Sequence, residues 1–140
     1  MKSIILFSFV SLAICGSTKK SNCPPEGFNT IKDFDVTQYM GTWHAQAQSV
    51  TSYLPKNRNY CVQAIYDLKN KETVAIDNYS NEGEVNGKIS GGNFEANIPD
   101  LKNPSKLRVG PTWLPNFFKG PYWLVYAEKD QSGVYSCIFN

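Results

Sequence analysis

The residues able to carry out chemistry are few and scattered along the chain. His44 is the only histidine among 140 residues, and it lies far in sequence from every cysteine. No Cys-x-x-Cys pair is present, so a zinc site is not indicated. The 12 carboxylates are dispersed, and no serine or cysteine lies in a recognisable nucleophile setting. We therefore expect a protein that is not an enzyme and that holds neither a metal nor a cofactor.

The beginning of the chain is typical of a secretory signal peptide. Lys2 precedes a run of mostly apolar residues over 4–14, and small residues follow it. The run is too short to span a bilayer. Cleavage after Cys15 and cleavage after Ser17 both satisfy the small-residue rule. We predict a signal peptide over residues 1–17 and a secreted, extracellular domain over residues 18–140.

The number of cysteines carries information in an oxidising compartment. Of the four cysteines, Cys15 leaves with the predicted signal peptide, so that Cys23, Cys61 and Cys137 remain. Three is an odd number, and at least one of these thiols lacks a partner within the chain.

Composition and charge exclude several classes of protein. The length of 140 residues suits one domain, and 41% hydrophobic residues are enough for a packed core rather than a disordered chain. The formal charge is +2, and the basic residues form no stripe. A nucleic-acid partner is therefore not expected.

Alternating apolar residues and turn signals predict seven short strands and no long helix. The connections are mostly of hairpin size, which favours an antiparallel up-and-down meander. Several inward positions are small or polar, so we expect a hollow barrel rather than a filled sandwich. The candidate strands cover residues 43–50, 62–68, 74–78, 85–97, 107–109, 122–127 and 134–139, of which the Gly-rich 85–97 is expected to be bent or bulged.

The stretches Phe34-Asp35-Val36 and Tyr39-Met40-Gly41-Thr42-Trp43 resemble the opening signature of the lipocalins, and the whole pattern is closest to the apolipoprotein D-like members. The resemblance runs in order over the expected mature chain. It implies an all-β lipocalin-type barrel in which Gly41 and Trp43 are structural residues of the closed end. The further matching segments are Asn22-Cys23-Pro24, Gln63-Ala64-Ile65-Tyr66, Lys106-Leu107-Arg108-Val109, Pro121-Tyr122-Trp123 and Tyr135-Ser136-Cys137.

For function, the resemblance implies a carrier of a small hydrophobic ligand such as a fatty acid, sterol, retinoid or pigment. Plain core packing is the alternative for each wall residue. The register of the sixth strand is open: either Tyr122 and Leu124 or Trp123 and Val125 face inward. The predicted ligand-binding residues are Ala45, Ala47, Tyr53, Val62, Ala64, Tyr66, Ile76, Asn78, Leu107, Val109, Trp113, Tyr122 and Leu124.

Two other functions remain open. Large apolar side chains in the loops, among them Trp113, Phe117 and Phe118, suggest a secreted interaction module that contacts a membrane or protein surface. An isomerase-like enzyme on the same fold would need acid or thiol groups in the cavity, which the pattern does not show.

The chain departs from the lipocalin pattern at its C-terminus. We expect about seven strands, with the eighth strand, the C-terminal helix and the arginine that stacks on Trp43 missing. Unpaired edges on the first and last strands would favour dimerisation. The resemblance also implies a Cys23–Cys137 disulfide and, because the partner of Cys61 belongs to the missing tail, a free thiol at Cys61.

Overall fold

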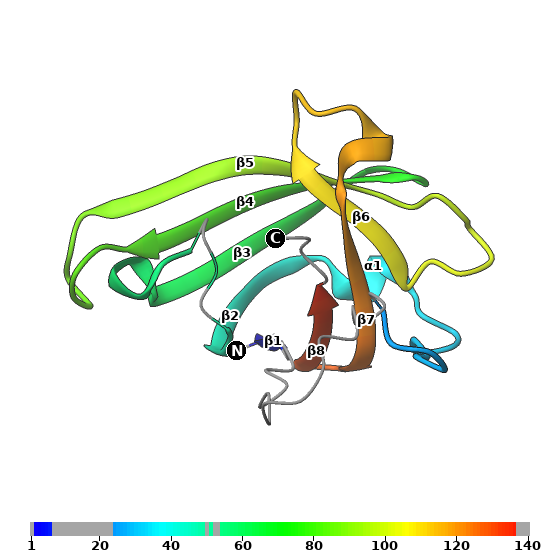
Figure 1. Cartoon of the computed structure of the whole chain (residues 1–140), viewed down its shortest axis with the longest axis horizontal. Helices are drawn as coiled ribbons and strands as arrows, with labels where there is room; N and C mark the ends of the chain where they lie inside the picture. The colour runs from blue at the N-terminus through cyan, green and yellow to red at the C-terminus, as the bar shows by residue number, and fades with distance from the viewer. Residues whose placement is uncertain (1, 7–23, 50, 52–53, 137–140) are drawn as a thin grey trace, which may run out of the picture.

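Eight β-strands in the described part of the chain are hydrogen-bonded in sequence order and close into a barrel (Figure 1). The computed structural model describes residues 2–6, 24–49, 51 and 54–136. One short helix, α1 (Val36–Tyr39), precedes the second strand, and two 3₁₀ turns lie in loops, η1 (Lys56–Arg58) and η2 (Asn116–Phe118). The strands are β1 (Lys2–Leu6), β2 (Gly41–Ala47), β3 (Tyr60–Asn70), β4 (Thr73–Asn81), β5 (Ile89–Asn97), β6 (Lys106–Pro111), β7 (Gly120–Glu128) and β8 (Gln131–Ser136).

The seven predicted strands correspond to β2 through β8, and the expected all-β barrel is confirmed. Consecutive strands from β2 to β8 pair antiparallel, as an up-and-down meander requires. The alternation that predicted them reflects burial: in β4, Val74 and Ile76 are buried on the core side, and Ala75 between them is only half-buried.

Of the bend or bulge expected in the Gly-rich segment, the bulge is absent from β5, because this strand pairs with β4 in one unbroken register from Asn97 to Ile89, and the bend stays a prediction. Gly91 serves a close approach between the two strands instead. A Cβ atom at this position would lie 2.4 Å from the carbonyl oxygen of Asn78. Register shifts occur in other strands, as in β3, where the register shifts between Tyr60 and Gln63 and Cys61 has a positive φ of 48°.

The expected strand count is corrected by β1, which lies between β2 and β8. It pairs parallel with both neighbours, with Ile4 opposite Ala45 on one side and Ser132 on the other. Ile4 is 3% exposed and contributes to the core. The two strand edges expected to be unpaired are therefore covered. The signal peptide over residues 1–17 stays a prediction, and its removal would take β1 out of the barrel.

Lys2 corrects a second expectation, that Trp43 has no cation partner. The Lys2 ammonium lies 5.6 Å from the centre of the Trp43 ring system, within the range of a cation–π contact. It also donates to the carbonyl oxygen of Met40 at 2.7 Å. Gly41, which opens β2, has a φ of 101° that a side chain would strain.

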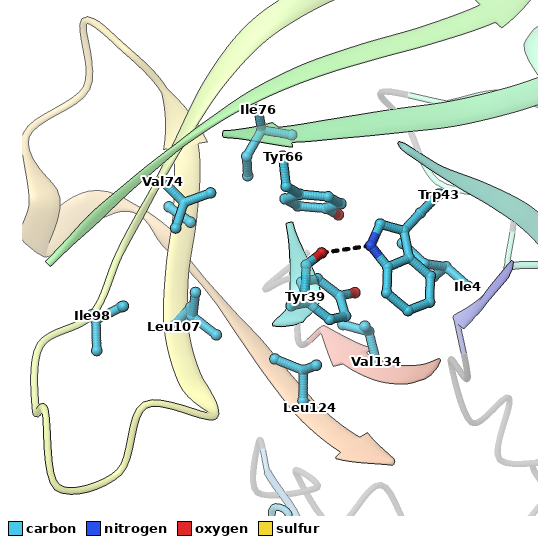
Figure 2. Close-up of a cluster of buried hydrophobic side chains, with 11 residues drawn as sticks. Ile4, Tyr39, Trp43, Tyr66, Val74, Ile76, Ile98, Leu107, Leu124 and Val134 are labelled. Carbon is cyan, nitrogen blue, oxygen red and sulfur yellow. Dashed lines mark hydrogen bonds between the residues drawn. The ribbon is translucent and has the colours of Figure 1, made fainter. Parts of the chain in front are cut away.

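The closed end of the barrel is filled by aromatic side chains around Trp43 (Figure 2). Trp43 is 1% exposed, and its indole nitrogen donates to the carbonyl oxygen of Tyr39 at 2.7 Å. The Tyr39 ring stacks on Trp43 with a centroid distance of 4.6 Å. Helix α1 presents Tyr39 to this contact, and Asp35 caps the helix by accepting from the main-chain nitrogen of Thr37. This packing forms the floor of the space above it.

Candidate functional site

A cavity of about 610 Å³ extends from Trp43 toward the open end of the barrel. Its wall is mostly apolar, with Ile4 from β1, Ile76 from β4 and Phe94 from β5. The size falls within the range of about 300 to 1,000 Å³ that is usual for small-molecule sites. The space can therefore hold a lipid-sized molecule without rearrangement of the strands.

Most of the residues that the sequence predicts to bind a ligand lie at this wall. Alternation along β2, β3 and β4 brings side chains that are far apart in sequence to one face, as between the paired residues Ala64 and Asn78. In β7 the open choice of register is resolved, since Tyr122 lines the cavity and Leu124 is buried beneath it. The predicted residues at the wall are Ala45, Val62, Ala64, Tyr66, Ile76, Asn78, Val109 and Tyr122.

Four of the predicted residues that the structure describes do not line the cavity. Leu107 and Leu124 point inward but pack in the core, where they are 5% and 0% exposed. Ala47 is exposed, because the register with β1 shifts by one residue after Ala45. Trp113 lies in the β6–β7 loop and is 79% exposed. Tyr53 lies outside the described residues.

A chain of four hydroxyl groups lies at the floor of the cavity. The Tyr66 and Tyr122 oxygens are 2.7 Å apart, and the Tyr39 oxygen is 3.3 Å from Tyr122 and 3.3 Å from Ser132 Oγ. Burial raises the pKa of Tyr66 and of Tyr122 well above the ordinary value, and it raises the pKa of Tyr39 as well. The phenols are therefore neutral hydrogen-bonding groups.

Arg58 is a wall residue that sequence reasoning missed. It comes from η1 near the open end, where its guanidinium donates to Ser90 Oγ. Its Nε lies 3.4 Å from the Glu82 carboxylate, yet this buried atom has no hydrogen-bond partner among the described residues. No sequence pattern marks this loop arginine as a wall residue, because only the fold of the 48–59 loop turns its side chain toward the cavity. Among the described wall residues it is the one basic side chain.

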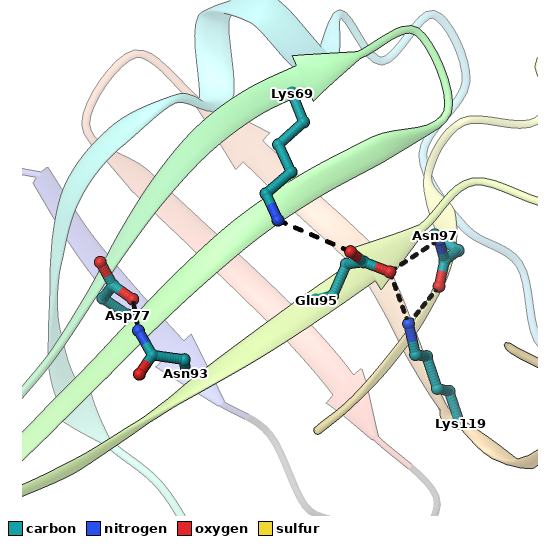
Figure 3. A network of polar contacts seen from close by, with 6 residues as sticks. All are labelled: Lys69, Asp77, Asn93, Glu95, Asn97 and Lys119. Atoms are coloured by element: carbon teal, nitrogen blue, oxygen red, sulfur yellow. Dashed lines mark hydrogen bonds and ion pairs between the residues drawn. The ribbon is translucent and has the colours of Figure 1, made fainter. Parts of the chain in front are cut away.

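An outer network of polar side chains holds the β6–β7 loop against the barrel (Figure 3). Lys119 Nζ lies 2.8 Å from Glu95 Oε1 and 2.6 Å from Asn97 Oδ1. The Lys119 side chain is 1% exposed, and its stem crosses Gly110, where a Cβ would lie 2.8 Å from Lys119 Cγ. Lys69 approaches the other Glu95 oxygen at 3.7 Å. This network fixes the base of the loop and lets the tip project.

The tip of that loop carries large exposed apolar side chains. Phe117 and Phe118 are 71% and 65% exposed, beside the exposed Trp113. Leu114 of the same loop lines the cavity. The loop therefore joins the inside of the barrel to an apolar outer surface, which we call the rim and define as Trp113, Phe117 and Phe118.

The predicted disulfide and the predicted free thiol concern residues outside this site. Cys61 is exposed and unbridged, and its Sγ lies 3.7 Å from the carbonyl oxygen of Val85. The Cys23–Cys137 disulfide lies outside the described residues, so the disulfide and the resulting free thiol stay predictions.

The described residues contain no cluster of three potential metal ligands. They also contain no helix long and apolar enough to cross a membrane.

Comparison with known proteins agrees with the barrel and its signature. The sequence profile of the lipocalin-like domain matches residues 34–136, which includes α1 and every strand from β2 to β8. The chain belongs to the lipocalin family. It is 29% identical to temperature-induced lipocalin-1 of Arabidopsis thaliana over 104 residues, which are 71% of this chain and 54% of that protein. This lipocalin thus spans about half the length of the curated relative it matches, and the family consists generally of binding proteins rather than enzymes.

Proposed function

We propose that this lipocalin binds and carries a small hydrophobic ligand in the cavity above Trp43. The single observation that supports this most is the 610 Å³ space with a mainly apolar wall and a few polar groups at its ends. Transfer of apolar ligand surface from water into such a wall is favourable by about 25 cal/mol per Å², so few directional contacts are needed. Fatty acids, sterols, retinoids and pigments have the required chemistry.

Filling the cavity tests this function. Ala45→Phe places a ring in the space that the ligand would occupy, and we expect at least a roughly tenfold loss of affinity. The measurement is displacement of the fluorescent probe anilinonaphthalene sulfonate by hexadecanoate. Gln46→Phe is the matched control, because the same ring is added at an exposed position of β2 and binding should be unchanged. Equal loss in both variants, or no saturable binding by the folded parent protein, would contradict the carrier function.

Secretion and the apolipoprotein D-like subtype belong to the same proposal. Both rest on the sequence: the predicted signal peptide over residues 1–17 supports secretion, and the ordered motifs from Asn22 to Cys137 support the subtype. Expression with the complete N-terminus in a secreting cell, followed by N-terminal sequencing of the medium, tests the localisation. Retention of the whole protein inside the cell would oppose it.

A second candidate function is contact with an uncharged lipid surface through the rim. The three exposed rim side chains favour it, and the only charged residue of the 112–119 loop, Lys119, is buried by its ion pair with Glu95. An apolar loop without exposed charge suits a zwitterionic bilayer rather than an anionic one. On this proposal the rim brings the open end of the cavity to the source of the ligand.

Removal of the rim tests that contact. We expect Trp113→Ser combined with Phe117→Ser to lower co-flotation with phosphatidylcholine vesicles about tenfold or more, since two large apolar side chains no longer enter the bilayer. Exchange of the exposed Ile89, on the β5 strand, for Ser is the control for general surface hydrophobicity. Flotation that depends on anionic lipid, or that persists in the double variant, would argue against the rim as the contact.

A further inference from the structure

β1 is inserted into the described barrel differently from the other strands. It runs parallel to both of its neighbours, whereas the strand pairs from β2 to β8 are antiparallel (Figure 1). Its main chain is paired on both sides, with Ser3 opposite His44 in β2 and opposite Gln131 in β8. We call the two facing edges, residues 43–47 of β2 and 131–134 of β8, the seam. The seam is one strand wide and pairs an inserted strand along both edges.

The middle of the seam holds a branched aliphatic side chain between two small residues. Ile4 lies opposite Ala45 on one edge and opposite Ser132 on the other. It is 3% exposed, belongs to the core cluster around Trp43 and lines the cavity (Figure 2). An alanine and a serine leave space between them that a large side chain fills. A charged side chain at this position would be buried among apolar groups, which is unfavourable, so the seam selects an aliphatic residue here.

The closed end of the seam favours a cation two residues before that aliphatic side chain. Lys2 Nζ donates to the carbonyl oxygen of Met40 at 2.7 Å and to that of Gln38 at 3.3 Å. The same ammonium lies 5.6 Å from the centre of the Trp43 ring system. Carbonyl oxygens and the face of an aromatic ring both present negative partial charge. These groups therefore favour a lysine over an acidic or an apolar side chain at this position.

The edges of the seam have none of the usual protection against pairing with another chain. Residues 43–47 and 131–134 include no proline, lysine, arginine, aspartate or glutamate. Proline and charged side chains, lysine above all, are what proteins commonly place on an open strand edge. The strand that covers these edges belongs to the predicted signal peptide over residues 1–17, and its removal would leave both edges unpaired.

We propose that the seam is a docking site for an extended peptide segment of another protein, in a chain from which the N-terminal segment has been removed. The segment runs parallel to β2 and β8 and carries a lysine two positions before an isoleucine or valine. Its main chain pairs along both edges, whereas strand addition to an ordinary sheet edge pairs along one. Its aliphatic side chain completes the cavity wall at the position of Ile4, and its ammonium takes the place of Lys2. This site is separate from ligand carriage and does not depend on it.

Fragment exchange tests this docking, starting from the full chain. A site for a sequence-specific protease is inserted between Ser17 and Thr18, the folded protein is cut, and the N-terminal fragment is removed by gel filtration in urea. The barrel is then returned to buffer with a fluorescein-labelled peptide that has the sequence of residues 1–8. We expect a saturable rise in fluorescence anisotropy. Binding to the uncut protein should be about tenfold weaker or more, because tethered β1 occupies the seam at high effective concentration.

Variant peptides test the proposed pattern. The peptide change Ile4→Asp should weaken binding about tenfold or more, because it buries a charge, and Lys2→Met should weaken it about fivefold. Ser3→Thr is the matched control, since neighbouring residues of a strand face opposite sides and residue 3 points away from the core. A second peptide keeps only lysine at position 2 and isoleucine at position 4, with threonine elsewhere. It should bind within about tenfold of the parent peptide, because the main chain supplies the remaining contacts.

Each outcome decides the inference. If the barrel folds only when the peptide is added, docking is coupled to folding and the inference stands. Absence of saturable binding of the parent peptide, whether or not the barrel refolds without it, overturns the inference. Equal affinity for the Ile4→Asp peptide overturns it as well, since such binding would not use the seam. A stripped barrel that sediments as a dimer, and that the peptide does not dissociate, would show that a second copy of the chain fills the seam instead.

Discussion

A chain that begins at residue 18 is expected to be less stable than the full chain by about 4 kcal/mol or more, because it lacks β1. The loss combines the core contacts of Ile4, which is 3% exposed, with the hydrogen bonds that β1 makes to β2 and β8. The total free energy of unfolding of a domain is only about 5 to 15 kcal/mol. Urea denaturation followed by tryptophan fluorescence measures the difference.

Lys2→Met separates the contribution of the β1 strand to stability from the contribution of the Lys2 charge. This variant keeps β1 and loses the cation over Trp43 together with the hydrogen bond to the Met40 carbonyl, so we expect a smaller loss of about 1 to 2 kcal/mol. Equal urea midpoints for the full chain and the chain from residue 18 would show that the barrel does not depend on β1. That outcome would fit a secreted form from which the predicted signal peptide has been removed.

Glu95→Gln is expected to destabilise the protein by about 3 kcal/mol, because it leaves the Lys119 ammonium buried without its anion. Lys119 is 1% exposed and lies 2.8 Å from Glu95 Oε1. Addition of Lys119→Met should recover most of the loss, since the uncharged stem can remain over Gly110. Chemical denaturation of the two single variants and the double variant completes a thermodynamic cycle.

Lys69→Met is the control for this network. The Lys69 side chain is 52% exposed and 3.7 Å from Glu95 Oε2, and exposed ion pairs contribute only about 0 to 1 kcal/mol. A loss as large as that of Glu95→Gln would mean that the surface pair, and not the buried one, holds the loop. Full stability of Glu95→Gln would show that Asn97 alone satisfies the buried ammonium.

The same ion pair predicts a pH dependence. The hydrogen bond from Lys119 is the main cause that holds the pKa of Glu95 below its ordinary value. The unfolded chain therefore binds a proton at Glu95 at higher pH than the folded chain does. This contribution to stability is present above the ordinary pKa of a glutamate and is lost as the pH falls from about 5 through the folded pKa. Glu95→Gln should show a shallower loss of stability over that range.

The sequence predicts the faces of the strands better than the depth of each residue along the barrel. Alternation places Leu107 and Val109 on the same inward face, and both point inward in the structure. Only Val109 reaches the cavity, because Leu107 lies nearer the closed end where the core is filled. Depth depends on how far neighbouring strands are staggered, which a single strand does not encode.

Other features depend on partners that are distant in sequence. The apolar run after Lys2 has the pattern of a signal peptide, and nothing local indicates that it pairs with β2 and β8. The position of Ala47 changes because of a register shift against that same strand. Arg58 reaches the cavity only through the path of its loop. Each of these features is set by tertiary pairing rather than by local periodicity.

The place of β1 in the barrel also determines when the molecule can finish folding. Ser3 pairs with His44 and with Gln131, so the last gap closes between segments that lie almost at opposite ends of the described chain. Contacts of such long sequence separation carry the largest loop-closure entropy and slow the folding of β-proteins. Before β8 has emerged from the ribosome, β1 can pair only with β2. The hairpins from β2 to β7 can form early during synthesis, and closure of the ring is a late event that follows the emergence of β8.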